Sequence, residues 1–223
     1  EGTVVEIDSV VYHIGSNIYV PDSIESLSNV AIGVMEQVSG LQFDGNDNYL
    51  VNRIDKKSHI YITRDNLYAG MDWYTGWDSN ELGSAYANDN NVWLALGDLL
   101  LGNSYTIIHE LAHVLMWRQS QWYHEKTLNE GFAEYTAYLT LLEMEEKHPE
   151  AAVYFDKSTS SVNSMNMSHE DLYKQPIEYW LNHPFEDGGN GNYSIGFRLM
   201  AYLQDVYADY SRWIAHFGKQ YSF

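Results

Sequence analysis

The chain lacks cysteine altogether, has few basic residues and contains no long hydrophobic run. The absence of cysteine excludes disulfides, thiolate zinc sites and a cysteine nucleophile, so any tight metal site must use histidine and carboxylate side chains. The best apolar candidate, residues 92–101, is interrupted by Gly97 and Asp98 and is shorter than the roughly 18 residues that a membrane span needs. We therefore expect no segment that crosses a membrane.

Basic residues are scarce: 12 lysines and arginines stand against 31 acidic residues, and the formal net charge is −19. This charge repels phosphate backbones and anionic lipid surfaces, so we expect neither nucleic acid nor a membrane as a partner. The first residues lack the basic start and apolar stretch of a signal peptide, so an export signal is either absent or already removed. Many Tyr and Asn, few Lys and no Cys are typical of exported bacterial proteins and predict an extracellular location.

Hydrophobic residues make up 45% of the chain, which is enough for one sizeable core. There is no internal repeat and no linker rich in Pro or Ser, so we predict a single domain over residues 1–223. The expected secondary structure changes near residue 104, from short strands before it to helices after it. We predict an α+β fold, with a small mixed sheet in residues 1–103 and a mostly helical half in residues 104–223.

The expected elements follow from hydrophobic periodicity and from turn residues. Strands are predicted at Thr3–Ile7, in part of Val10–Val20, at His59–Thr63, and as a hairpin within residues 83–96. Helices are predicted from after Asp22 to a stop at Gly40, and over residues 105–118, 128–146 and 195–210. The hairpin would lie just before the helix that carries the metal motif.

That motif is His109-Glu110-Leu111-Ala112-His113, the HExxH pattern of zinc peptidases. Residues four apart lie on the same face of a helix, so both imidazoles can reach one ion. Glu110 is rotated by about 100° from His109, which places it beside the ion as a base rather than as a ligand. Ser104 can cap this helix at its start.

A zinc peptidase needs a third protein ligand and leaves the fourth position for water. The next predicted helix presents Glu130 and Glu134 one turn apart. Glu130 can bind the ion directly, and Glu134 can accept the outer N–H of a metal-bound histidine and so fix its tautomer. Gly131 leaves the backbone beside this ligand free of a side chain, which allows the two metal-binding helices to approach each other closely.

The two segments together resemble the gluzincins, the metallopeptidases that include thermolysin, the zinc aminopeptidases and bacterial collagenases. The resemblance is carried by the HELAH segment at residues 109–113 and the NEGFAE segment at residues 129–134. It implies a zincin-like fold with an edge strand over the metal-binding helix, one catalytic Zn²⁺, and Glu130 as the third ligand. The metzincin pattern is absent, because Met116 and Gln119 stand where that pattern requires Gly and His.

A weaker match concerns the residue that would bind the negatively charged oxygen, the oxyanion, formed when water attacks the peptide bond. Tyr193-Ser194-Ile195-Gly196 is similar to the Tyr-x-x-Gly element of the gluzincin aminopeptidases, in which the tyrosine hydroxyl binds the oxyanion of the tetrahedral intermediate. The resemblance therefore implies this role for Tyr193, with packing as the alternative. His183 and Tyr123 are further candidates for the same role.

Substrate binding is predicted by the same analogy. The hairpin near Ala85 and Tyr86 could supply an edge strand that pairs with an extended peptide. The Gly-x-Met-Glu-Asn segment with which the aminopeptidases grip a free amino terminus is missing, and the nearest segment is Gly70-Met71-Asp72-Trp73. Its absence favours an endopeptidase over an aminopeptidase.

The sequence therefore predicts that Glu110 deprotonates a water polarised by zinc, which attacks the peptide bond of a protein or peptide substrate. Three alternatives stay open: an aminopeptidase, hydrolysis of a non-peptide bond, and a degenerate zinc-binding domain that recognises a partner without cleaving it.

Asp44–Asn48 contains oxygen ligands for calcium but lacks the full loop pattern, so a plain turn is preferred. His124 and Glu125 could compete with Glu130 for the ion.

Overall fold

The computed structural model describes nine segments of the chain. They are residues 3–8, 10–15, 22–43, 57–63, 85–88, 91–95, 105–119, 126–155 and 191–211. Strands occur only in the first part of the described chain, and the later part is helical. The prediction of an α+β fold is confirmed at this level.

The strands form one mixed sheet of five strands in the order β1-β2-β3-β5-β4. Their bounds are β1 Thr3–Ile7, β2 Val10–Ile14, β3 Ser58–Thr63, β4 Ala85–Asn88 and β5 Asn91–Ala95. The outer pairs, β1 with β2 and β4 with β5, are antiparallel, whereas β3 runs parallel to both β2 and β5. The predicted hairpin is confirmed by the pairing of Asn88 with Asn91.

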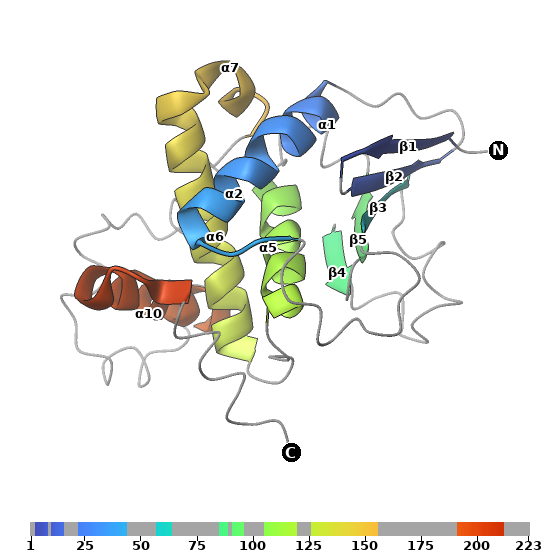
Figure 1. The fold of residues 1–223 in the computed structure, drawn as a ribbon. Coiled ribbons are helices and arrows are strands. Elements are labelled where there is room, and N and C mark those ends of the chain that lie inside the picture. Colours follow the sequence, from blue (N-terminus) through green and yellow to red (C-terminus); the bar gives the residue numbers. More distant parts are fainter. Residues whose placement is uncertain are drawn as a thin grey trace.

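One face of this sheet forms part of the core. Side chains alternate between the two faces along a strand, and the buried alternate residues of β2 and β3 are apolar except for Ser58 at the start of β3. The apolar residues are Val10, Tyr12, Ile14, Ile60 and Ile62, and they belong to the same hydrophobic cluster as the buried side chains of the helices. Figure 1 shows the described helices on one side of the sheet.

The first helix contains an irregular turn. It consists of α1 Ser23–Ser26, the π-helical turn η1 Leu27–Ala31 and α2 Ile32–Ser39. Gly40 ends it with a φ of 69°, in the left-handed region that glycine adopts without a steric penalty. The predicted stop at Gly40 is confirmed, but the apolar periodicity gave no sign of the π turn.

Tyr12 connects the sheet to that turn, because its hydroxyl contacts the Ser28 hydroxyl and the carbonyl oxygen of Ile24. Burial raises the pKa of Tyr12 to about 12, although the Ser28 contact acts in the opposite direction. The neutral phenol therefore contributes stability that is fully present below the unfolded-state pKa of 10.0 and is lost as pH rises towards about 12.

We expect Tyr12→Phe to cost about 1 kcal/mol of the free energy of unfolding at neutral pH, because it removes a buried hydroxyl and its hydrogen bonds. Above about pH 10 the difference from the wild type should shrink, since only the wild type can ionise at this position. Urea unfolding of both proteins from neutral pH to about pH 11 measures the two curves. Curves that stay parallel over the whole range would contradict this account of Tyr12.

The remaining helices are α5 Tyr105–Gln119, α6 Lys126–Lys147, the short α7 Pro149–Ala152 and α10 Gly191–Tyr207. Helix α5 lies between the sheet and α6 and contacts β4, β5 and α6. Helix α10 packs on α6 on the side away from the sheet (Figure 1). The elements therefore follow one another as sheet, α5, α6 and α10, with α5 and α6 at the centre.

The bounds of α10 differ from the prediction of residues 195–210. The helix begins four residues earlier, in a Gly-Asn-Tyr-Ser segment of low helix propensity. The helix as a whole packs against α6. It ends where Ala208 adopts a φ of 53° and donates its N–H to the Gln204 carbonyl oxygen at 2.8 Å. Alanine is an unusual residue for such a left-handed helix end, so this end could not be predicted from the residue type.

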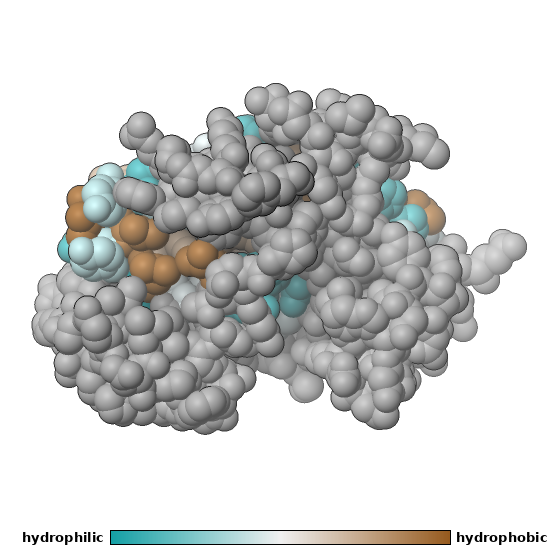
Figure 2. All heavy atoms as spheres, turned by 90° about the horizontal axis from the view of Figure 1, so that it is seen from below, coloured by the Kyte–Doolittle hydropathy of each residue, from teal (hydrophilic) through white to brown (hydrophobic). Residues whose placement is uncertain are grey.

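Three of the large apolar side chains that remain exposed lie on α10: Tyr202, Val206 and Tyr207. Figure 2 shows apolar surface on the same side of the molecule, on the left, where Figure 1 places α10.

Among the described residues, none of the helices combines the length and the apolar character needed to cross a membrane.

Candidate metal centre

Two packed helices bring the predicted ligands together. The HExxH residues lie in the middle of α5, where His109 and His113 are one turn apart and both buried. Glu130 lies in the first turns of α6, which packs against α5. Both segments lack proline and are rich in apolar residues, and in α5 residues 107–116 are buried all around the helix between the sheet and α6.

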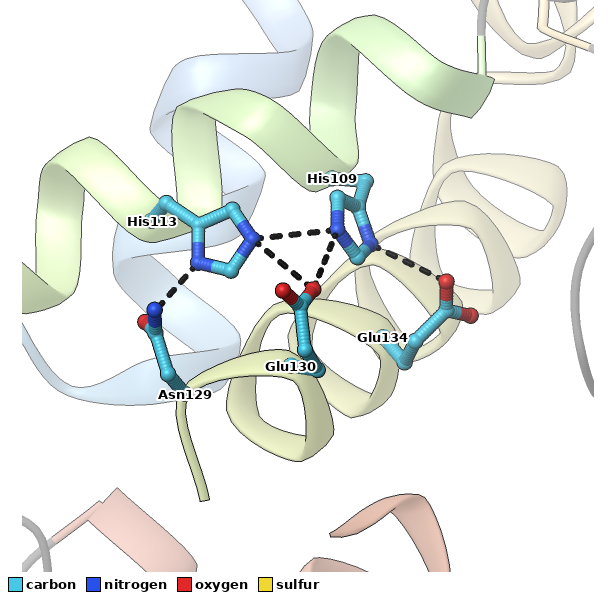
Figure 3. A network of polar contacts seen from close by, with 5 residues as sticks. All are labelled: His109, His113, Asn129, Glu130 and Glu134. Carbon is cyan, nitrogen blue, oxygen red and sulfur yellow. Dashed lines mark hydrogen bonds and ion pairs between the residues drawn. The ribbon is translucent and has the colours of Figure 1, made fainter. Parts of the chain in front are cut away.

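The three side chains point toward one another (Figure 3). The Oε2 atom of Glu130 lies 3.3 Å from Nε2 of His109 and 3.3 Å from Nε2 of His113. The two Nε2 atoms lie 3.1 Å apart. Among the described residues, this is the group of three histidine or carboxylate side chains whose ligand atoms are close enough to share one metal ion.

The separations of these three atoms fit a tetrahedral ion. Ligand atoms about 2.0 Å from a tetrahedral zinc lie about 3.3 Å from each other, which is close to the three observed distances. Glu130 Oε2 is also buried and, among the described residues, receives no hydrogen bond of acceptable geometry. A buried carboxylate oxygen between two imidazole nitrogens is what a bound cation would satisfy, so the residues present fit Zn²⁺.

The charges at the centre support the same interpretation. Burial alone would raise the pKa of Glu130, but the two imidazoles outweigh burial and hold that pKa well below its usual range. For His109, burial acts to lower the pKa, whereas Glu134, Glu130 and Glu110 together raise it well above its usual value. The acidic groups around the histidines thus create a site that favours positive charge.

Each histidine is oriented by a different partner on α6. Nδ1 of His109 lies 3.0 Å from Oε1 of Glu134, and Nδ1 of His113 lies 2.9 Å from Oδ1 of Asn129. Nδ1 of His113 donates its N–H to Asn129, whereas the contact of His109 with Glu134 is close but lacks the geometry of a hydrogen bond. A proton on each Nδ1, facing these partners, leaves the lone pair of each Nε2 directed at the shared centre. The sequence predicts the part of Glu134 but assigns no role to Asn129. Its position directly before Glu130 was the available signal.

We expect Glu134→Gln and Asn129→Ala each to weaken zinc affinity by about 10- to 100-fold. The first replaces the charged acceptor beside His109 with a weaker neutral one, and the second removes the acceptor of the His113 N–H. Competition with a colorimetric chelator measures the affinity. Glu146→Gln is a matched control, since Glu146 is an exposed acid on the same helix. Affinities equal to that of the wild type in both variants would rule out the orienting role.

Glu110 follows His109 on α5 and is also buried. Burial raises its pKa, and the neighbouring imidazoles only partly offset this effect. A carboxylate whose pKa is shifted toward neutrality is a better proton acceptor and donor near pH 7 than an exposed glutamate.

Gly131 explains how α10 reaches the centre. A Cβ atom built on Gly131 would overlap the backbone of Gly196 and lie 2.5 Å from its carbonyl oxygen. Helices α6 and α10 therefore cross with two glycines in contact, one residue away from the ligand Glu130. A close approach was predicted here between the two metal-binding helices, but the helix that the Gly131 backbone meets is α10 and not α5.

Other predicted residues are only partly described. Tyr193 lies in the first turn of α10, and Ala85 and Tyr86 lie in the edge strand β4, but their side chains are outside the described part of the chain. The remaining predicted candidates fall wholly outside the described residues: Ser104, Tyr123, His124, Glu125, His183 and the turn Asp44–Asn48.

No protein-family model matches the chain, and a search of curated proteins gave no match either. The interpretation of the site therefore depends on its own residues and geometry.

Proposed function

We propose that the protein is a zinc-dependent endopeptidase of gluzincin type with a zincin-like fold. The observation that carries the proposal is the triangle of His109 Nε2, His113 Nε2 and Glu130 Oε2, with sides of 3.1–3.3 Å. Glu110, next to the first ligand, completes the set of groups that peptide hydrolysis needs.

Each side chain has a distinct task in this proposal. His109, His113 and Glu130 would hold the zinc ion, which when bound polarises a water molecule and the substrate carbonyl. Glu110 removes a proton from that water and delivers it to the leaving amine. Glu134 and Asn129 keep the two imidazoles in the tautomer and orientation that metal binding requires.

The edge strand supports binding of an extended peptide. Strand β4 is at the end of the sheet, pairs with β5 on one side and contacts α5, the helix that carries the histidines (Figure 1). A peptide strand added to β4 would run along the metal centre and gain backbone hydrogen bonds independent of its sequence. Tyr193 of α10 is our candidate for an oxyanion donor, because α10 packs beside Glu130 through Gly131.

The test is incubation of the protein with a diverse peptide mixture, with and without a zinc chelator, read by mass spectrometry. We expect new internal cuts that disappear with the chelator and return when zinc is added back. Trimming from the amino terminus would point instead to an aminopeptidase. If protein that contains one zinc ion per chain cleaves none of the peptides, the result would support a binding domain over an enzyme.

A further inference from the structure

A second pair of histidines lies on the sheet, on two neighbouring strands other than β4 and β5, which contact the metal-binding helix α5. His13 is on β2 and His59 is on β3, and both alternate with the buried residues of the core face. They therefore belong to the opposite face of the sheet, together with Tyr61. All three side chains are half-buried.

The two imidazoles meet at a short distance. Nε2 of His13 lies 2.8 Å from Nδ1 of His59. The ring of His13 also stacks on the ring of Tyr61, with centroids 4.3 Å apart and planes inclined by 8°. The parallel register places His13 directly opposite Tyr61, so this stacking fixes the His13 ring on the sheet surface.

We propose that His13 and His59 form a second metal site, which takes a divalent transition-metal ion of tetragonal geometry, with Cu²⁺ the ion bound most tightly. Two nitrogens at right angles around an ion, each about 2.0 Å away, lie about 2.8 Å apart. The hydrogen-bonded nitrogens already have this separation, so an ion can replace the shared proton without the two nitrogens moving apart. A tetrahedral ion would require about 3.3 Å, the spacing found instead at the centre on α5 and α6.

Proton balance is straightforward. In the metal-free pair one imidazole N–H donates to the lone pair of the other ring, so each neutral histidine carries a single proton. When an ion binds, the donor ring moves its proton to its other nitrogen, and small rotations of the two rings direct both lone pairs at the ion. Two neutral histidines can thus become ligands without net release of a proton.

The composition of the site sets its strength and selectivity. In the part of the chain that the structure describes, no third histidine or carboxylate joins this pair closely enough to form a three-ligand cluster. Water would fill the other positions, which the half-buried setting allows. Imidazole ligands favour Cu²⁺ over Ni²⁺ and Zn²⁺ in the order of intrinsic affinity, and the net charge of −19 attracts cations generally.

The experiment uses the full chain loaded with zinc and titrated with Cu²⁺, followed by calorimetry and electron paramagnetic resonance. Zinc is measured in the same samples, so that copper entering the α5–α6 centre is recognised by loss of zinc. We expect one additional Cu²⁺ per chain with zinc retained, and a tetragonal spectrum with coupling to two imidazole nitrogens. His13→Gln and His59→Gln should each weaken copper binding by at least about tenfold.

His148→Gln is the control, because His148 is a half-buried histidine at the start of α7, where its one described ion-pair contact is with Glu150. It should leave copper affinity unchanged. If either pair variant fails to fold, the wild-type spectrum decides: two coupled nitrogens support the site, and one or none overturns it. The proposal is also overturned if the only copper bound is copper that has displaced zinc. It is overturned as well if the wild type, His13→Gln and His59→Gln all bind copper equally.

Discussion

Replacing Glu110 by glutamine is expected to lower peptide-bond hydrolysis by about 10²- to 10⁴-fold while the zinc content stays at one ion per chain. Glutamine has nearly the same size and shape as glutamate, so the buried position next to His109 can be filled without repacking. It cannot accept a proton, and the loss corresponds to about 3–5 kcal/mol of barrier height. Zinc should remain because Glu110 is not one of the three converging groups.

The measurement is the rate of internal cleavage of a peptide found in the mass-spectrometry screen, at equal zinc content for each protein. Glu146→Gln, at an exposed position on α6, serves as the control and should keep the wild-type rate. Glu110→Gln protein that cleaves at the wild-type rate with zinc bound would show that another group is the base. Loss of zinc from the variant would show that Glu110 helps to hold the ion.

Gly131→Ala is expected to destabilise the protein by about 3 kcal/mol or more and to weaken zinc binding at the same time. The added methyl would overlap the Gly196 backbone, and backbone cannot rotate away as a flexible side chain can. Relief of the overlap requires α6 and α10 to separate, which displaces the turn that carries Glu130. Thermal or urea unfolding and a zinc competition assay measure the two effects.

Gly33→Ala provides the matched control within another helix. Gly33 lies in α2, is exposed, and has no atom within 4 Å of a Cβ added there. Alanine has the higher helix propensity, so this variant should be more stable than the wild type by about 0.5–1 kcal/mol. Gly131→Ala protein with wild-type stability and zinc affinity would contradict the close crossing of α6 and α10.

The parts of the fold that depend on local patterns could be predicted from the sequence. The α5 helix follows from a run of apolar residues without glycine or proline, and the stop of α2 follows from Gly40. The β4–β5 hairpin follows from an Asn/Asp turn between two strand-like runs. In each case the signal lies within a few residues of the feature that it predicts.

Long-range pairing could not be predicted in the same way. The position of β3 between β2 and β5 joins strands that are far apart in the sequence, and hydrophobic alternation does not encode a partner. The hydrogen bond of Asn129 to His113 depends on how α6 packs on α5. The meeting of His13 with His59 likewise depends on the parallel register of β2 and β3.

The most direct test of the central claim is the coordination of zinc in the loaded protein, by X-ray absorption together with a crystal structure collected at the zinc edge. We expect one ion bound by Nε2 of His109, Nε2 of His113 and a carboxylate oxygen of Glu130 at about 2.0–2.2 Å, with water in the remaining position. An ion held by other residues, with the Glu130 side chain turned away from the two histidines, would contradict the account.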